Sequence, residues 1–316
     1  MPSVYCFVFV YLISFVIVLE GQDWFLVWLG LEINMMSFLM LIYRRYDVGV
    51  IESCMSYFFI QSVGSAIFIG MFYVSMCFLS GVLILILSYK IGAGPFFYWF
   101  PSMCMGIDWV SCYILMLFQK IIPLLLASLF VHWVMWVVIM LSLIMGVLGS
   151  FNQVNIKSLM AYSSIHHLGW IFMIMMSLNL SWVLYLFVYG LVLLSVVMLL
   201  ISDEIVNLSL VYLSSMKLVF MMSMLSMAGM PPLLGFFLKW MALMNVVSMN
   251  ILLLFMLVLV SVVMLYVYMR IVYDVFMGGE VEWNFNYEML VVNSNMEVLS
   301  VVGVFVGIIL GFYMIM

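Results

Sequence analysis

Four charged residues lie inside long apolar stretches of the sequence, and proton transfer is the chemistry that suits them. Glu32 lies in WFLVWLGLEINMMSFLMLIY, Lys90 in LILILSYKIGAGPFFYWFP, Lys120 in CYILMLFQKIIPLLLASLF and Lys239 in AGMPPLLGFFLKWMALM. Placing one charged side chain near the centre of a bilayer costs roughly 2.5–3.5 kcal/mol. Snorkelling to the surface and structural ion pairing are the alternatives to a functional role. Snorkelling does not explain Glu32 and Lys120, because both lie far inside their apolar stretches. Ion pairing does not explain all three lysines, because one carboxylate leaves two of them unpaired.

These residues predict a hydrated proton path that needs no redox group. A buried lysine holds its proton more readily when a carboxylate is near, because opposite charges attract strongly at low dielectric constant. Moving or screening Glu32 would therefore change whether a neighbouring lysine is protonated. Histidine relays protons near neutral pH, and the segment AYSSIHHLGW offers His166 and His167. We favour His167, which has Ser163 four residues earlier on the same helical face; a hydrogen-bonding strut is the alternative.

The composition requires a membrane around these residues. Of the 316 residues, 70% are apolar and 7% are charged, whereas a soluble domain has about 45–50% apolar and about 25% charged residues. A soluble fold and a separate catalytic domain are therefore excluded, and the continuous apolar runs do not alternate as the strands of a membrane barrel do. At about 20 residues per crossing, this apolar content allows about eleven helices. The sequence predicts an all-α polytopic membrane protein.

Short links divide the apolar content into eleven expected crossings. They run at about 2–19, 23–43, 50–74, 76–100, 106–128, 130–149, 155–178, 180–202, 208–247, 250–276 and 297–316. The fourth contains Gly92–Pro95 and the ninth contains Met230–Pro232, so both should be broken. We expect a single membrane domain over 1–316, with two five-helix pseudo-repeats at 1–128 and 130–276 and a C-terminal helix at 297–316. Because five is odd, the second unit would be inverted, as in ion-coupled transporters.

The charge distribution gives an orientation and excludes several partners. Arg44, Arg45 and Lys157 fall on the same side as the N-terminus, which the positive-inside rule assigns to the inner compartment. The C-terminus then lies on the opposite side. The sequence has no basic patch for nucleic acid, no CxxC pair, no phosphate-binding glycine motif and no Cys/His metal spacing. The five cysteines are interpreted as small core residues.

Two features of the composition indicate an organelle-encoded protein. Methionine occurs 35 times, whereas threonine does not occur at all. Threonine is compatible with membrane helices, so a coding bias rather than physics accounts for this profile. The first 19 residues are apolar but have no basic leader and no cleavage site, and we expect them to be a retained crossing.

Several segments of this sequence resemble one family. WLGLEINMMSF, KIGAGPFFYWFP, FQKIIP, KSLMAYSSIHHLGW and GMPPLLGFFLKW occur in the order seen in mitochondrial NADH–ubiquinone oxidoreductase chain 2, the antiporter-like subunits of respiratory complex I. The matching segments comprise about 50 residues and are distributed over nearly the whole chain. It implies that Glu32 pairs with Lys90, that Lys120 is the lysine of the central axis, and that Lys239 lies near the exit. His167 takes the family's histidine position, whereas Phe97 replaces another family histidine, so the relay there is in doubt.

The resemblance also implies the setting of the chain. It implies a proton-translocating subunit in the mitochondrial inner membrane, with the N-terminus in the matrix and the C-terminus in the intermembrane space. The complex uses NADH, FMN, iron–sulfur clusters and ubiquinone, and none of these is expected on this chain. Expected partners are the antiporter-like chain 4, the small chain 4L, accessory subunits and phospholipids. A free-standing secondary ion antiporter and a purely structural membrane scaffold are the two rival interpretations.

Overall fold

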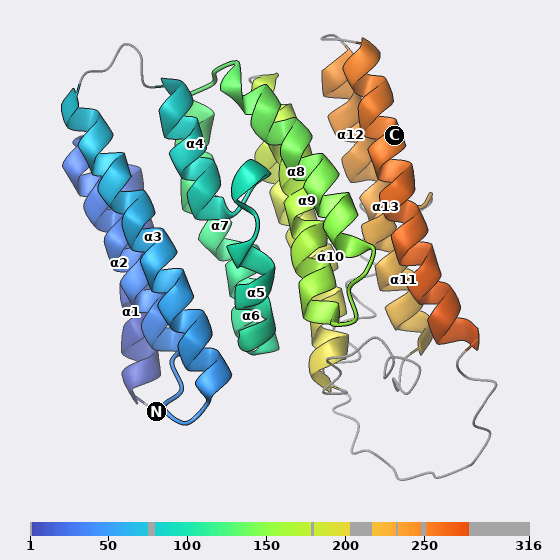
Figure 1. The fold of residues 1–316 in the computed structure, drawn as a ribbon, viewed down its shortest axis with the longest axis horizontal. Coiled ribbons are helices and arrows are strands. Elements are labelled where there is room, and N and C mark those ends of the chain that lie inside the picture. The colour runs from blue at the N-terminus through green and yellow to red at the C-terminus, as the bar shows by residue number, and fades with distance from the viewer. Residues whose placement is uncertain are drawn as a thin grey trace. The chain divides into compact units, whose positions relative to one another are not determined.

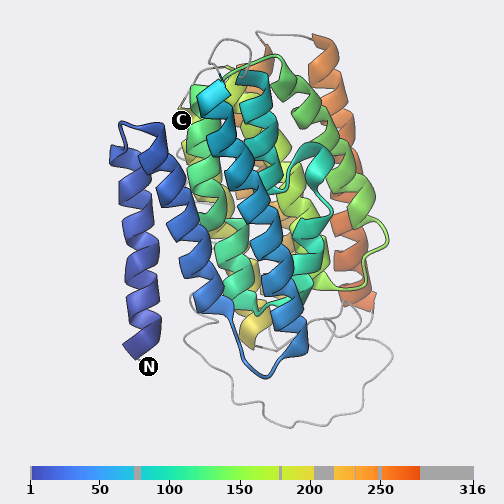
Figure 2. The same ribbon diagram turned by 60° about the vertical axis from the view of Figure 1, so that its left-hand side comes forward.

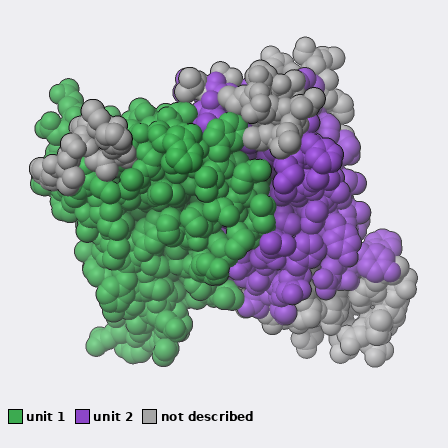
Figure 3. All heavy atoms as spheres, turned by 45° about the horizontal axis from the view of Figure 1, so that its top comes forward, with its two compact units in different colours: residues 1–145 green, residues 146–316 purple. Residues whose placement is uncertain are grey.

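The computed structural model describes residues 2–74, 80–177, 180–202, 217–231, 233–247 and 251–277. All regular elements in these ranges are helices (Figure 1). Helices are expected because a backbone in hydrocarbon must satisfy its hydrogen bonds internally. The chain divides into two compact units, residues 1–145 and 146–316 (Figure 3).

The first unit holds the helices that carry Glu32, Lys90 and Lys120. It contains α1 (Pro2–Glu20), α2 (Trp24–Ile42), α3 (Val48–Val74), α4 (Ser80–Ile91), the 3-10 helix η1 (Gly94–Phe96), α5 (Trp99–Gly106), α6 (Trp109–Met116), α7 (Phe118–Leu129) and the start of α8 (Val134–Ser150). Helix α3 packs against α2, α4 and α5, and α7 packs against α4 and α6. Helices α1 and α2 form a pair beside the others (Figure 2).

The second unit holds the helices that carry His167 and Lys239. It contains the end of α8, α9 (Ile156–Met176), α10 (Ser181–Ser202), α11 (Lys217–Ala228), α12 (Leu234–Val247) and α13 (Ile251–Met277). Helix α10 packs against α9, α11 and α12, and α13 packs against α11 and α12. Nearly every residue of α9 is buried, whereas many apolar side chains of α13 are exposed, as lipid-facing residues would be.

The structure confirms the class of fold, an all-helical polytopic membrane protein. Among the described residues, six helices are long and apolar enough to cross a membrane, or seven if the bent pair that ends at Gly106 is one span. The predicted total was eleven; helices over residues 4–20, 134–150 and 217–228 are apolar but shorter. The expected crossing at 297–316 and the start of the ninth crossing lie outside the described residues.

Both predicted breaks are confirmed. Helix α4 ends at Ile91, and the chain bends by 92° before α5. Helix α11 ends at Ala228, and α12 begins at Leu234. In each case a glycine with positive φ follows the first helix, Gly92 at 76° and Gly229 at 82°.

The fifth crossing, expected over 106–128, is one apolar span at Trp109–Leu129 with an interruption inside it. Helices α6 and α7 meet at Leu117, whose φ and ψ are −116° and −67°. The Leu117 carbonyl accepts the Lys120 N–H at 3.2 Å, which is a tighter turn than an α-helix makes. Pro123 lies inside α7, and its ring disfavours a regular helix over the preceding turn. Lys120 therefore begins a new helix instead of lying in the middle of one.

Candidate functional site

The break after α4 places Lys90 at a helix end inside the protein. Lys90 is in the last turn of α4, and its side chain is buried. The amide of Ala93 donates to the Ser88 carbonyl at 2.9 Å and closes the end of the helix. A positive charge is favourable there, because the C-terminus of a helix carries a partial negative charge. The Lys90 carbonyl itself accepts a hydrogen bond from Gln61 Nε2 of α3 at 2.8 Å.

Helix α3 contacts both Glu32 and Lys90 through adjacent small residues. The Ser65 hydroxyl donates to Glu32 Oε1. A Cβ atom on Gly64 would lie 3.0 Å from Cγ of Lys90, so the lysine side chain crosses α3 at this glycine. The side chains of Glu32 and Lys90 therefore reach two consecutive residues of α3. Both residues lie in the described part of the chain and form no ion pair with each other, so the direct pairing that the resemblance implies is not seen.

Lys120 lies in the first turn of α7 against α5. Its side chain is buried, and Nζ lies 4.6 Å from the centre of the Phe100 ring. An ammonium over an aromatic face is attracted by the electron density of the ring. The buried side chains of Cys104 and Cys112 lie near the ammonium. These three neighbours could not be identified from the sequence, because only the fold brings them close to the lysine.

One cavity in the first unit is lined by both Lys90 and Lys120. Its volume is about 20 Å³, and a water molecule needs roughly 10–15 Å³ on the same measure. The Tyr57 hydroxyl donates to Gln119 Oε1 at 3.3 Å in its wall. Asn34 Oδ1 and Gln119 Nε2 are buried without a hydrogen-bond partner among the described residues. The lining residues are Leu31, Asn34, Met35, Tyr57, Gln61, Lys90, Ile91, Trp99, Phe100, Leu115, Gln119, Lys120, Ile122 and Pro123.

The break in the second unit is closed by Lys239. Its Nζ donates to the Ala228 carbonyl at 2.6 Å, across the break from α12 to the end of α11. A Cβ atom on Gly229 would lie 3.0 Å from this Nζ, so the lysine side chain packs directly on the glycine. The φ of 82° at this position also favours glycine. Gly235 allows a closer approach still, because a Cβ there would lie 1.7 Å from the Ser226 carbonyl oxygen. The lysine satisfies a carbonyl that the end of α11 leaves without an intrahelical partner.

The two histidines of α9 have different partners. His167 Nδ1 lies 2.8 Å from the hydroxyl of Tyr185 on α10. His166 Nε2 accepts a hydrogen bond from Trp170 Nε1 at 3.1 Å, one turn along the same helix. His166 is therefore held within its own helix, whereas His167 connects two helices. Tyr185 was not identified from the sequence, because it is one of 18 tyrosines and nothing in its neighbours distinguishes it.

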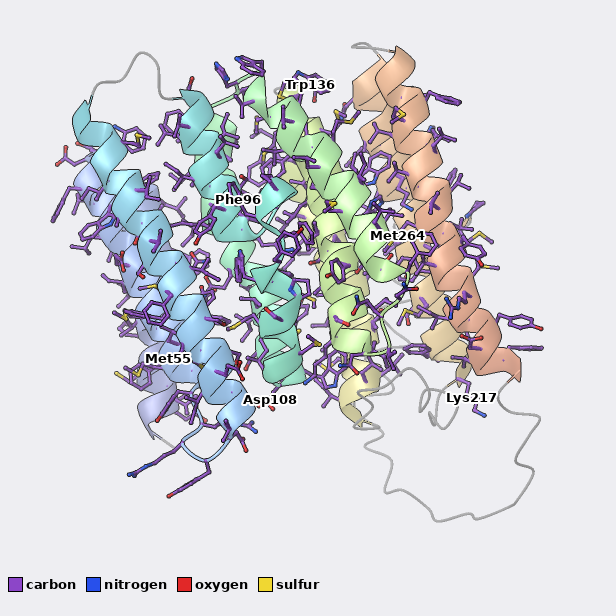
Figure 4. All side chains as sticks on the ribbon, viewed as in Figure 1. Met55, Phe96, Asp108, Trp136, Lys217 and Met264 are labelled. Atoms are coloured by element: carbon purple, nitrogen blue, oxygen red, sulfur yellow. The ribbon has the colours of Figure 1, made fainter. Side chains whose placement is uncertain are left out.

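The structure also describes Phe97 and four of the five cysteines. Cys54, Cys104 and Cys112 are buried core residues, as predicted, whereas Cys6 is exposed and Cys77 lies outside the described residues. Phe97 is buried just after η1 and packs on Tyr98, with ring centres 4.1 Å apart. The adjacent Phe96 belongs to η1 (Figure 4). Among the described residues, no group of three His, Cys, Asp or Glu side chains is arranged to hold a metal ion.

Comparison with known proteins connects this geometry to a family. Residues 73–265 match the family model described as NADH:quinone oxidoreductase/Mrp antiporter, transmembrane. The chain is 36% identical to NADH-ubiquinone oxidoreductase chain 2 of Anopheles gambiae, over 74% of each chain. It is also 36% identical to the same chain of Artemia franciscana, over 74% of this chain and 78% of the relative.

Solved structures agree on the fold. A chain of respiratory complex I from Thermus thermophilus superposes with a TM-score of 0.84 at 22% identity, over 98% of this chain and 78% of the other. A chain of the Mrp complex from Dietzia sp. DQ12-45-1b superposes with a TM-score of 0.72 at 15% identity, over 97% and 74%. The chain therefore belongs to the NADH-ubiquinone oxidoreductase chain 2 family, the antiporter-like membrane subunits of respiratory complex I.

Proposed function

We propose that Glu32, Lys90, Lys120, Lys239 and His167 form the path by which this chain takes part in proton translocation in NADH:ubiquinone oxidoreductase. The observation that carries the proposal is the cavity that Lys90 and Lys120 share. Two buried lysines around a space large enough for water can exchange a proton through that water. Asn34 and Gln119 supply polar atoms in the wall to orient it.

Glu32 controls the first step of this path. Lys90 holds its proton more readily when the carboxylate is near, because the two charges attract each other in a medium of low dielectric constant. Ser65 donates to the same carboxylate and so competes for it. A movement of α2 relative to α3 would change the Glu32–Lys90 distance and release or capture a proton at Lys90. The path needs no redox group on this chain.

The second unit supplies a later part of the path. Lys239 lies at a broken helix, as Lys90 does, and each lysine is bound to or close to the C-terminus of the half-helix before the break. This correspondence supports two inverted five-helix repeats, at residues 1–128 and 130–276, followed by a C-terminal helix at 297–316. We infer about eleven crossings in all, with the N-terminus in the matrix and the C-terminus in the intermembrane space.

The setting follows from the family. We infer a multi-pass position in the mitochondrial inner membrane, beside the antiporter-like chain 4 and the small chain 4L, with accessory subunits and phospholipids around them. Oxidation of NADH, passage of electrons through FMN and iron–sulfur clusters, and reduction of ubiquinone are assigned to other subunits. This chain contributes the proton movement that is coupled to them.

Lys120→Met tests the path, since methionine keeps the volume of the side chain and removes the titratable group. We expect the complex to assemble and the ratio of protons translocated to electrons transferred to fall. Lys217→Met is the matched control, because Lys217 is the first residue of α11 (Figure 4), is only partly buried and lines no part of the cavity. The measurement is this ratio in the assembled complex reconstituted in vesicles.

The rival interpretations predict different results. A structural scaffold predicts an unchanged ratio at an unchanged rate with Lys120→Met, and this result would remove Lys120 from the mechanism. A free-standing antiporter predicts that the chain purifies apart from any NADH-oxidising assembly. Purification of the chain within such an assembly is the result expected for a subunit of the complex.

A further inference from the structure

Four buried polar side chains meet in the second unit, outside the set of lysines. Ser163 and His167 lie one turn apart on α9, Tyr185 lies on α10, and Tyr268 lies on α13. All four are almost completely inaccessible, and Tyr185 and Tyr268 are among the largest fully buried side chains. Buried tyrosine hydroxyls require polar partners. Burying these polar groups lowers the stability of the unit unless they are hydrogen-bonded, which points to a function that requires them.

Tyr185 holds the imidazole of His167 from one side. The hydroxyl lies 2.8 Å from Nδ1. The ring of Tyr189, one turn along α10, lies against the imidazole, with centres 4.6 Å apart and planes inclined by 38°. One hydrogen bond and one packed ring thus fix both the position and the plane of the imidazole. The imidazole is therefore held by two residues of the same helix, α10.

A hydroxyl is the kind of partner that suits a histidine that changes its charge. A carboxylate would favour the positive imidazolium, and a backbone carbonyl could only accept from Nδ1–H. A tyrosine hydroxyl both donates and accepts. It can donate to Nδ1 of the neutral ring, and it can accept from Nδ1–H when the ring is positive or in its other tautomer. The contact at 2.8 Å therefore survives every protonation state of His167.

Tyr268 supports Tyr185 in this position. The two tyrosines are close enough to interact electrostatically. The Tyr268 hydroxyl faces the Ser163 side chain, which donates to the Met160 carbonyl at 2.7 Å. The cluster thus returns to α9 one turn from His167 and connects three helices through hydroxyl groups. Helix α12, which carries Lys239, packs against both α9 and α10 beside it.

We propose that Tyr185 is a positioning residue for proton transfer at His167, holding the imidazole in one place while the ring gains and loses a proton. The inference rests on the proposed function, because it gives a partner to one member of the proton path. It is independent of the cavity in the first unit, since none of its residues lines that cavity. Tyr185 itself carries no charge in this role.

The test is Tyr185→Phe in the assembled complex. Phenylalanine keeps the ring and removes only the hydroxyl, so the amount of assembled complex should be unchanged. We expect the ratio of protons translocated to electrons transferred to fall toward the value of a Lys239→Met complex measured in parallel. A role in packing alone would leave this ratio unchanged. Tyr266→Phe is the matched control, because Tyr266 lies on α13 two residues before Tyr268 but is 60% exposed.

The outcomes separate this inference from the proposed function. A normal ratio in Tyr185→Phe together with a reduced ratio in Lys239→Met would overturn the role of Tyr185 and leave the path standing. A normal ratio in Lys239→Met would overturn the path itself. A reduced ratio in Tyr185→Phe and Lys239→Met, with a normal ratio in Tyr266→Phe, is the result that supports both.

Discussion

Gln119 and Asn34 show how neutral side chains complete a site that charged residues define. Both line the cavity between Lys90 and Lys120, and each has a buried polar atom without a partner among the described residues. Leaving such a group unsatisfied costs about 1–3 kcal/mol. A water molecule in the cavity would satisfy both groups and connect the lysines. The two amides are therefore expected to determine how fast a proton crosses, although neither carries one.

Gln119→Leu removes the amide and keeps the approximate size of the side chain. We expect the complex to assemble and the coupled proton-transfer rate to fall by about tenfold, because the loss of one hydrogen bond to an ordered water is worth about 1 kcal/mol or somewhat more. Gln153→Leu is the control, since Gln153 bonds the Gly149 carbonyl in the link before α9. The measurement is the rate of proton uptake relative to the rate of NADH oxidation. Equal rates in the two variants would contradict a role of Gln119 in proton transfer.

At the scale of the helices, glycine determines how the broken helices fit together. At Gly235 a Cβ would overlap a backbone carbonyl oxygen, and backbone cannot move aside as a flexible side chain can. At Gly64 the nearest atom belongs to the flexible side chain of Lys90. The α11–α12 contact is therefore the more sensitive of the two to substitution.

Gly235→Ala is expected to disrupt the contact between α11 and α12. We expect a destabilisation of about 3 kcal/mol or more, at the upper end of the usual cost of overpacking. Gly70→Ala on α3 is the control, because a Cβ at Gly70 meets no atom within 4 Å. The yield of assembled complex on native gels and its thermal midpoint provide the measurement. A stable Gly235→Ala complex would show that α12 can withdraw from α11.

At the scale of the whole molecule, the sequence predicted what depends on single residues and missed what depends on contacts between distant segments. Charges in apolar runs indicated Glu32, Lys90, Lys120 and Lys239, whose role in proton transfer stays a prediction. The Gly/Pro content predicted both broken helices. The partners of Lys120 and His167 could not be predicted, because Phe100 and Tyr185 reach them only through packing. The interruption at Leu117 could not be predicted, because leucine is a good helix former and only the backbone angles of this residue show the break.

The orientation of the chain is testable by labelling single cysteines. Asp47→Cys lies in the link between α2 and α3, and Trp133→Cys lies in the link between α7 and α8; both native residues are exposed. The helices of this unit run alternately between its two ends, so these links lie at opposite ends (Figure 1). We expect a membrane-impermeant thiol reagent to label Asp47→Cys from the matrix side alone and Trp133→Cys from the intermembrane side alone. The reverse pattern would invert the topology.

The hydrogen bond from Lys239 to the end of α11 links the charge of this lysine to the contact between two helices. The same ammonium that is proposed to carry a proton also caps the half-helix across the break. A positive charge at a helix C-terminus is worth roughly 0.3–2 kcal/mol, and this attraction is lost when the proton leaves. In the proposed path, each departure of the proton is therefore expected to weaken the contact between α11 and α12, and each arrival to strengthen it. The hydrogen bond itself can persist with a neutral amine, so the change in strength comes from the charge.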